Sequence, residues 1–357
     1  MVNKLRLRYV AIVAVVVATG LLSSCSTNST LGYYRQSIVG HTSLMLARKP
    51  IDKVLRSADE KLAQRLQRAI AIRRFASDSL GLPDNNSYTS YVQLKTDLPI
   101  WNVVAAEEFS LRAKQWCYPV VGCASYRGYY HKADAQSYAT LMQQRGYETT
   151  LAGATAYSTL GWFADPLTSA MFRRGDAALA ELIFHELAHQ QLYVKNDSRF
   201  NEAFASTVGE QGAITWLTMT GQQDLLKRYL RELKVREDFL QLLQNTKSQL
   251  QQVYQSDKSL PEKRKLKQQL FVQLQQQYQQ LKADKWNNHG WYDGWFKQPL
   301  NNARFVAIAT YRDLVPSFVQ LFERCGGDFS RFYRAVAVQA KTDDKNLNVA
   351  CLANANE

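Results

Sequence analysis

The sequence predicts a predominantly helical α+β fold, with a small antiparallel sheet and an inserted helical hairpin. Three features predict it. Apolar residues recur every three or four positions near the start of the chain and again over residues 222–285, as in amphipathic helices. Residues 87–130 are instead rich in β-branched and aromatic residues, which favours strands. Strands and helices do not alternate regularly, so the pattern indicates α+β.

The bulk composition is that of a folded globular protein. The chain has 357 residues, of which 46% are hydrophobic and 21% are charged. This length allows one large domain or two modest ones. The expected segments are 1–24 for a signal peptide, 25–32 for a tether, 33–225 for the core, 226–285 for the hairpin and 286–357 for a C-terminal helical segment that packs on the core.

The first 24 residues are typical of a secretory signal peptide. Lys4, Arg6 and Arg8 precede an almost uninterrupted apolar run over residues 10–22. That run is shorter than the roughly 20 residues that a membrane-spanning helix needs. We therefore expect the segment to be removed from the mature protein.

The signal ends in Leu22-Ser23-Ser24-Cys25, which resembles a bacterial lipobox. The resemblance implies that Cys25 becomes the lipidated first residue and anchors the protein to a membrane. Ser26 follows it, whereas an Asp at that position usually retains a lipoprotein in the inner membrane. We therefore expect an outer-membrane lipoprotein that faces the periplasm of a bacterial cell envelope. The alternative is an ordinary signal peptide that ends near a cysteine by chance.

The elements that follow can be taken in chain order. Helical periodicity runs from Tyr33 to about Ser79, and Pro50 separates two of its segments. The strand-like segments of 87–130 come next. After them the sequence predicts a helix over about 132–146, a strand over 147–157, a helix that Asp176 caps, two hairpin helices with Pro261 at the start of the second, and a helical tail.

Four cysteines remain after the signal: Cys117, Cys123, Cys325 and Cys351. An exported protein meets an oxidising compartment, so the even count predicts two disulfides among three possible connectivities. Proximity in sequence favours Cys117 with Cys123 and Cys325 with Cys351. We do not interpret them as zinc ligands, because the sequence contains no C-x-x-C pair.

The stretch FHELAHQ, residues 184–190, carries the chemistry. Residues four apart lie on the same face of a helix, so His185 and His189 can both bind one metal ion. Glu186 stands one step round the helix, close enough to take a proton from a metal-bound water. This pattern predicts one Zn²⁺ per chain. The alternative is a helix with two ordinary histidines, although the chain has only five histidines in all.

The third ligand is expected to be Glu202, thirteen residues after His189. A turn over residues 195–198 lets a second helix pack back against the first, and Glu202 then faces the same ion. Two histidines and one glutamate leave one coordination position open, as catalytic zinc requires. Glu210 lies two helical turns further on, where it can accept a hydrogen bond from a ligand histidine or simply face solvent.

Asn201-Glu202-Ala203-Phe204-Ala205 looks like the NExFA segment of gluzincin aminopeptidases. More closely, the chain resembles a family of bacterial lipoproteins described as putative zinc aminopeptidases. The resemblance rests on segments 117–130, 156–171, 181–194, 200–210 and 301–311. It implies a zincin-like metallopeptidase core over 33–225, with a peptide as substrate. Larger gluzincins also hold the substrate amine with an acid that the stretch 151–159 lacks, and Glu107, Glu108 and Glu181 are candidates to replace it.

A zinc peptidase also needs a donor for the tetrahedral oxyanion. Tyr157 and Tyr311 are our candidates as catalytic residues, with His131 as a further one. Each is otherwise a packed or hydrogen-bonded ring. The predicted strand just before the metal helix can pair with an extended substrate.

The hairpin is basic: residues 222–285 hold 13 Lys plus Arg against 7 Asp plus Glu. That charge is either a solvated surface or a contact for anionic lipid or peptidoglycan. The sequence has no nucleic-acid-binding motif, so we expect no nucleic-acid partner. The competing functions are an envelope interaction or scaffold lipoprotein, with a structural or vestigial metal site, and an amidase acting on peptidoglycan stems.

Overall fold

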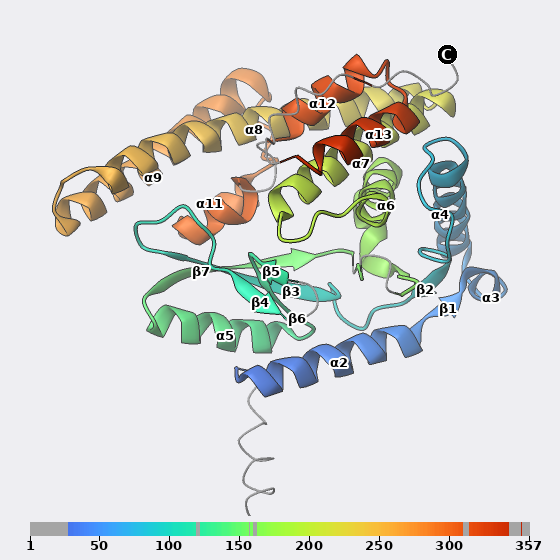
Figure 1. Ribbon diagram of the computed structural model, residues 1–357, viewed down its shortest axis with the longest axis horizontal. Helices are drawn as coiled ribbons and strands as arrows, with labels where there is room; N and C mark the ends of the chain where they lie inside the picture. Colours follow the sequence, from blue (N-terminus) through green and yellow to red (C-terminus); the bar gives the residue numbers. More distant parts are fainter. Residues whose placement is uncertain are drawn as a thin grey trace, which may run out of the picture.

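The structure is a computed structural model that describes residues 28–118, 122–156, 158–159, 163–309, 314–342 and 351 (Figure 1). Its helices are α2 (Thr30–Ala47), α3 (Ile51–Leu55), α4 (Glu60–Asp78), α5 (Lys132–Gln144), η1 (Ser169–Arg174), α6 (Asp176–Gln191), α7 (Ser198–Met219), α8 (Gln223–Gln255), α9 (Leu260–Lys285), α10 (Asp293–Phe296), α11 (Asn302–Ala309), α12 (Val315–Arg324) and α13 (Phe329–Gln339). Its strands are β1 (Lys49–Pro50), β2 (Ser90–Val92), β3 (Ile100–Glu107), β4 (Trp116–Tyr118), β5 (Gly122–Ala124), β6 (Arg127–Tyr129), β7 (Tyr147–Ala154) and β8 (Leu167–Thr168).

These elements confirm the predicted fold class, a predominantly helical α+β protein with small sheets. The sheets of the described residues have the orders β1-β2-β8, β6-β3-β7 and β4-β5. α2 begins at Thr30, inside the predicted tether, because the Ser29 side chain accepts a hydrogen bond from the backbone N–H of Gly32 and so caps the helix. Among the described helices, none is long and apolar enough to cross a membrane.

The antiparallel sheet β6-β3-β7 lies between two helical layers. Successive side chains of a strand point to opposite faces, and β3 uses both faces for packing. Val103 and Ala105 pack with the apolar side chains of α5, whereas Val104 and Ala106 pack with those of α11. Figure 1 shows α5 below the sheet and α11 above it.

The largest apolar cluster joins α4, α6, α7, α12 and α13 beside that sheet. Phe204 of α7 is fully buried and stacks on Phe332 of α13, with ring centroids 5.9 Å apart. Phe318 of α12 meets Phe200 of α7 edge to face at 5.1 Å. Such aromatic contacts bury large apolar areas and fix the angle between helices. The C-terminal helices α12 and α13 therefore pack against α7 and fix its position.

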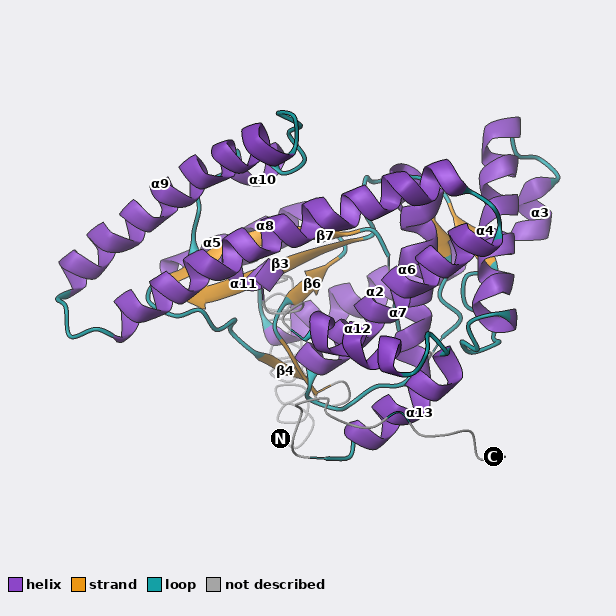
Figure 2. Cartoon of the chain, turned by 90° about the horizontal axis from the view of Figure 1, so that it is seen from above, coloured by secondary structure: helices purple, strands orange, loops and turns teal. Residues whose placement is uncertain are grey.

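α8 and α9 form a long hairpin with its own apolar core, built around Phe239, Leu250, Leu274 and Tyr278. Ser259 and Glu262 form a capping box at the start of α9. Figure 2 shows α8 running along the length of the molecule and α9 returning beside it.

The start of α9 is tied to the sheet by its basic residues. Arg264 donates to both carboxylate oxygens of Glu108, at 2.6 and 2.8 Å, and Lys267 pairs with Glu148. Part of the hairpin's positive charge is therefore neutralised by ion pairs with the rest of the protein.

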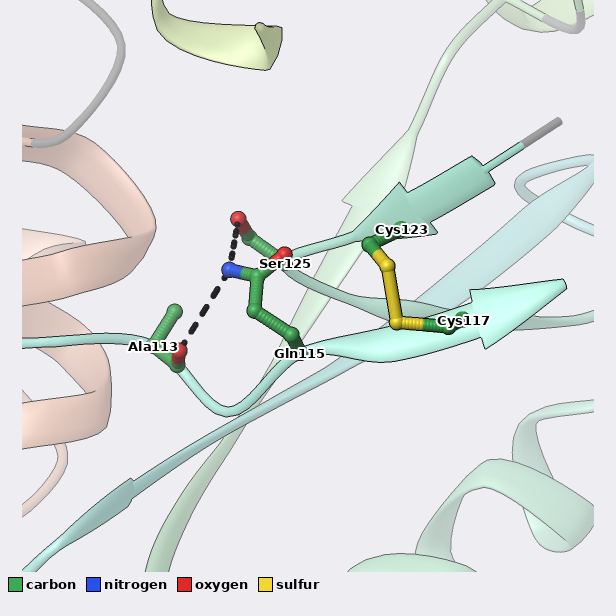
Figure 3. The surroundings of a disulfide bond; sticks show 5 residues. All are labelled: Ala113, Gln115, Cys117, Cys123 and Ser125. Carbon is green, nitrogen blue, oxygen red and sulfur yellow. Dashed lines mark hydrogen bonds between the residues drawn. A yellow bond between two sulfur atoms is a disulfide. The ribbon is translucent and has the colours of Figure 1, made fainter. Parts of the chain in front are cut away.

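Two disulfides are present, Cys117–Cys123 and Cys325–Cys351. Cys117 and Cys123 are direct cross-strand neighbours in the β4–β5 pair. Beside them the Gln115 side chain donates to the Ser125 hydroxyl at 2.8 Å and to the Ala113 carbonyl at 3.4 Å (Figure 3). The β4–β5 pair is thus closed by a disulfide bond at one point and by hydrogen bonds of the Gln115 side chain at another.

Candidate metal centre

α6 is the central helix of the largest cluster. Seven of its apolar residues are buried, on more than one side of the helix: Ala177, Leu179, Ala180, Ile183, Phe184, Leu187 and Ala188. Such a helix is stable because it is surrounded by protein. Gly175, not Asp176, occupies the N-cap, which corrects the predicted cap. Asp176 stands instead in the first turn, where its negative charge still favours the helix dipole.

The turn between α6 and α7 positions Glu202. Asn196 takes a left-handed backbone conformation, with φ of 63°, and Asp197 caps α7 by accepting from the N–H of Phe200 at 3.0 Å. The Asn201 side chain bonds both backbone groups of Val194, accepting from its N–H and donating to its carbonyl, each at 2.7 Å. Asn201 therefore locks the turn to the first residues of α7. Sequence reasoning had treated Asn201 only as part of a motif.

The structure brings His185, His189 and Glu202 together. The Nε2 atoms of the two histidines are 3.2 Å apart. Glu202 Oε2 is 3.5 Å from His185 Nε2, and Glu202 Oε1 is 3.8 Å from His189 Nε2. Ligands held about 2.0–2.2 Å from one tetrahedral ion are about 3.3–3.6 Å apart. The 3.5 Å distance lies in that range, the 3.2 Å distance is slightly short and the 3.8 Å distance is slightly wide. The donor set of two imidazoles and one carboxylate also fits zinc.

Glu186 stands beside these ligands on α6. Burial raises the pKa of its carboxyl to about 7, while the charge of His185 and a hydrogen bond from Ser158 act in the opposite direction. Ser158 lies next to Thr159, which donates through its backbone N–H and its hydroxyl to the fully buried carboxylate of Asp165, at 2.9 and 2.8 Å. The segment that leads from β7 to α6 is therefore attached to the carboxylate that the sequence predicted to be the base.

His189 is the more enclosed of the two histidines. Burial lowers its pKa to about 4, so the ring is neutral at physiological pH, as a metal ligand must be. Its Nδ1 atom is buried and has no hydrogen-bond partner in the described part of the chain. The acceptor that ligand histidines usually have on the second ring nitrogen is therefore not seen for His189.

Glu210 has a partner on a third helix. Its Oε1 accepts from Arg236 of α8 at 2.8 Å, and the same guanidinium donates to Glu181 of α6 at 2.7 and 3.1 Å. The Tyr229 hydroxyl donates to Glu181 at 2.9 Å. One arginine thus joins the helix of His185, the helix of Glu202 and the base of the hairpin. The predicted bond from Glu210 to a ligand histidine stays a prediction.

α6 and α7 approach closely at one glycine. A Cβ atom on Gly209 would lie 2.7 Å from the Glu181 carbonyl oxygen and 3.2 Å from the His185 Cβ. The absence of a side chain there allows the backbones to come near enough for ligands from both helices to meet.

The remaining predicted residues are less informative. Tyr157, Tyr311 and Cys25 lie outside the described residues. His131 is at the N-cap position of α5, the helix that covers the other face of the sheet from α11. Two of the acids proposed to bind the substrate amine already form ion pairs with arginines: Glu108 with Arg264 and Glu181 with Arg236.

Two tyrosines near the centre escaped sequence reasoning. The buried Tyr88 hydroxyl has no partner within the described residues, and burial together with the charge of Glu186 raises its pKa well above the ordinary value. Tyr193 is 43% exposed, and burial of its hydroxyl and the charge of Glu202 raise its pKa. Tyr193 lies beyond the end of α6 at Gln191, after the extended residue Leu192, so helical spacing from His189 does not predict its position.

Comparison with known proteins gives one match. A family model described as "Putative aminopeptidase" matches residues 32–349, which is most of the chain. Neither the search of curated proteins nor the search of solved structures found a match.

Proposed function

We propose that this chain, which belongs to the putative aminopeptidase family, is a zinc-dependent peptidase of the bacterial cell envelope that removes residues from the N-terminus of peptides. The observation that carries the proposal is the convergence of His185, His189 and Glu202, with Glu186 beside them. Three protein ligands leave a coordination position for water, which distinguishes a catalytic site from a closed structural one.

The residues have separate roles in this proposal. Bound zinc would supply Lewis acidity and lower the pKa of a water molecule toward neutrality. Glu186 takes the proton of the attacking water on its carboxylate and delivers it to the leaving amine. The hydrogen bond from Ser158 orients that carboxylate. Tyr157 and Tyr311 remain our proposed oxyanion donors, and the core that holds these groups is proposed to be zincin-like.

The location is part of the same proposal. Removal of residues 1–24 and lipidation of Cys25 would attach the protein to the outer membrane, facing the periplasm. The lipobox-like sequence and the four cysteines support export, because the described structure pairs all four in disulfides.

The test is hydrolysis of matched peptides with free and acetylated N-termini by a zinc-loaded chain that starts at Ser26. We expect cleavage of the free-amine peptides only. Glu186→Gln should lower kcat by at least about 100-fold while zinc stays bound, because it removes the base and no ligand. His189→Ala should lose zinc and activity together, because it removes a ligand.

The other outcomes are equally clear. Cleavage of both peptide sets would make the protein an endopeptidase. Undiminished turnover in Glu186→Gln would remove this residue as the base. Tight zinc binding with no cleavage of either set would favour the interaction-protein alternative.

A further inference from the structure

The outward face of α2 carries an apolar stripe. Leu31, Ile38, Val39 and Leu46 are exposed to 65%, 65%, 55% and 82%. At 100° per residue these four fall within one sector about 100° wide, the width of a typical apolar helix face. Arg35 lies among these side chains, so the face is amphipathic, and exposed apolar side chains gathered on one face mark an interaction site more often than isolated ones do.

The opposite face of α2 is fixed to the protein. Gly32, Gln36 and Leu44 are buried, and the Gln36 side chain donates to the Gly128 carbonyl of β6 at 3.2 Å. The Tyr33 ring stacks on the Tyr118 ring with centroids 5.6 Å apart. The stripe is therefore held facing outward, at the lower edge of the molecule in Figure 1.

The charged side chains of α2 and of the residues directly after it, up to Ile51, are all basic. Residues 1–51 contain no Asp or Glu. Arg35 lies within the stripe, and the exposed Arg48 and Lys49 follow the C-terminal end of α2. An apolar face with a basic fringe and no acidic residue matches the headgroup region of an anionic bilayer, where apolar side chains enter the acyl boundary and cations meet lipid phosphates.

The start of the helix lies close to the predicted anchor. Four residues lie between Cys25 and Thr30, and the five extended steps from one to the other span at most about 17 Å. A lipid on Cys25 would therefore bring the first turn of α2 to the membrane surface.

We propose that the outward face of α2 lies in the headgroup region of an anionic phospholipid bilayer and acts as an attachment separate from any lipid at Cys25. This surface does not depend on the peptidase activity. It also differs from the basic hairpin, whose Arg264 and Lys267 are engaged with Glu108 and Glu148.

The same helix contacts the segment that leads to the metal centre. The His41 ring of α2 packs on the Phe163 ring at 4.7 Å, and Arg48 donates to the Ala164 carbonyl at 3.0 Å. Asp165 comes next in the chain and holds Thr159, the neighbour of the serine that bonds Glu186. α2 therefore lies between the proposed bilayer and the segment that reaches the centre.

The experiment measures binding to vesicles without the lipid anchor. A chain that starts at Ser26 keeps every residue of the apolar clusters that the structure describes, the first of which is Tyr33. It is sedimented with vesicles of phosphatidylethanolamine and phosphatidylglycerol, and with vesicles of phosphatidylcholine alone. We expect binding to the anionic vesicles, weaker binding to the neutral ones, and partial release by salt.

The variant is the triple change Leu31→Gln, Ile38→Gln and Leu46→Gln, which should weaken binding at least about tenfold because three apolar side chains no longer enter the bilayer. The matched control carries the same change at three apolar residues of the hairpin: Leu230, Leu260 and Val272, exposed to 44%, 55% and 57%. We expect the control to bind as the unchanged chain does. Circular dichroism and zinc content should be the same in all three proteins.

Three results would overturn the proposal. The unchanged chain could fail to sediment with anionic vesicles, or the α2 variant could bind as well as the unchanged chain. Loss of binding in the hairpin control would assign the lipid surface to α8 and α9 instead. Peptidase activity enters none of these outcomes, so they stand apart from the test of the proposed function.

Discussion

The pairs α6–α7 and α8–α9 have the same topology and different uses. Each consists of two consecutive helices joined by a turn of a few residues. In the first pair Gly209 and Gly212 lie at the contact, where added Cβ atoms would meet neighbours at 2.7 and 2.8 Å. In the second pair large side chains such as Phe239 and Tyr278 fill the space between the helices.

The comparison shows how residue size decides what a helix pair can do. Small residues bring two backbones close, so short polar side chains from both helices can meet at one point. Large aromatic residues hold the two helices of the α8–α9 hairpin apart and bury apolar area between them. Arg236 connects the two pairs, because it lies on α8 of the hairpin and pairs with Glu181 of α6 and Glu210 of α7.

The largest effect on this arrangement is expected from Arg236→Met. Glu181 and Glu210 would then lie together, largely buried, without a cation, and we expect the free energy of unfolding to fall by about 3 kcal/mol. Zinc affinity should fall as well, because the two ligand helices lose their common tie. Urea unfolding and zinc titration measure the two effects.

The exposed Arg231 on the same helix provides the control. Arg231→Met should change the free energy of unfolding by less than about 0.5 kcal/mol. Equal stability of the Arg236 and Arg231 variants would show that the metal centre does not depend on the α8–α9 hairpin.

A smaller effect is expected from Gly209→Ala. The new Cβ would meet the Glu181 carbonyl, which belongs to the backbone of α6 and cannot swing aside as a flexible side chain can. We expect a loss of about 1–3 kcal/mol in the free energy of unfolding, with weaker zinc binding because Glu202 moves away from His185.

Gly294→Ala is the matched change, because a Cβ there meets nothing within 4 Å. It should leave zinc binding unchanged and alter stability by less than about 1 kcal/mol, in the stabilising direction. If both glycine variants behaved alike, close approach would not explain the difference between the helix pairs.

The smallest effect is expected from Arg264→Gln, near the start of α9. Its ion pair with Glu108 is short, at 2.6 Å, but the two side chains are 51% and 35% exposed, so solvent screens the attraction. The melting temperature should fall by less than about 2 °C, with unchanged zinc affinity. A fall in melting temperature as large as that of Arg236→Met would mean that the α8–α9 hairpin is attached to the protein chiefly through its contact with the sheet.

The sequence by itself determined the local part of the metal centre. His185 and His189 share a face because the helix repeats every 3.6 residues, and Glu202 follows after a turn too short to lead elsewhere. The β-branched and aromatic residues of 87–130 also predicted strands in the region where β2 to β6 lie. Such features depend on residues close in the chain, whose geometry the backbone constrains.

Only the tertiary structure decided the partners of the long polar side chains. Glu210 had the right helical spacing to serve a ligand histidine, and it also meets Arg236, which belongs to a helix that sequence spacing could not place. The same holds for Tyr88, distant in sequence from Glu186 and near it in space. Helical periodicity gives the direction of a side chain, but its partner depends on how separate elements dock, and that depends on packing summed over the whole apolar core.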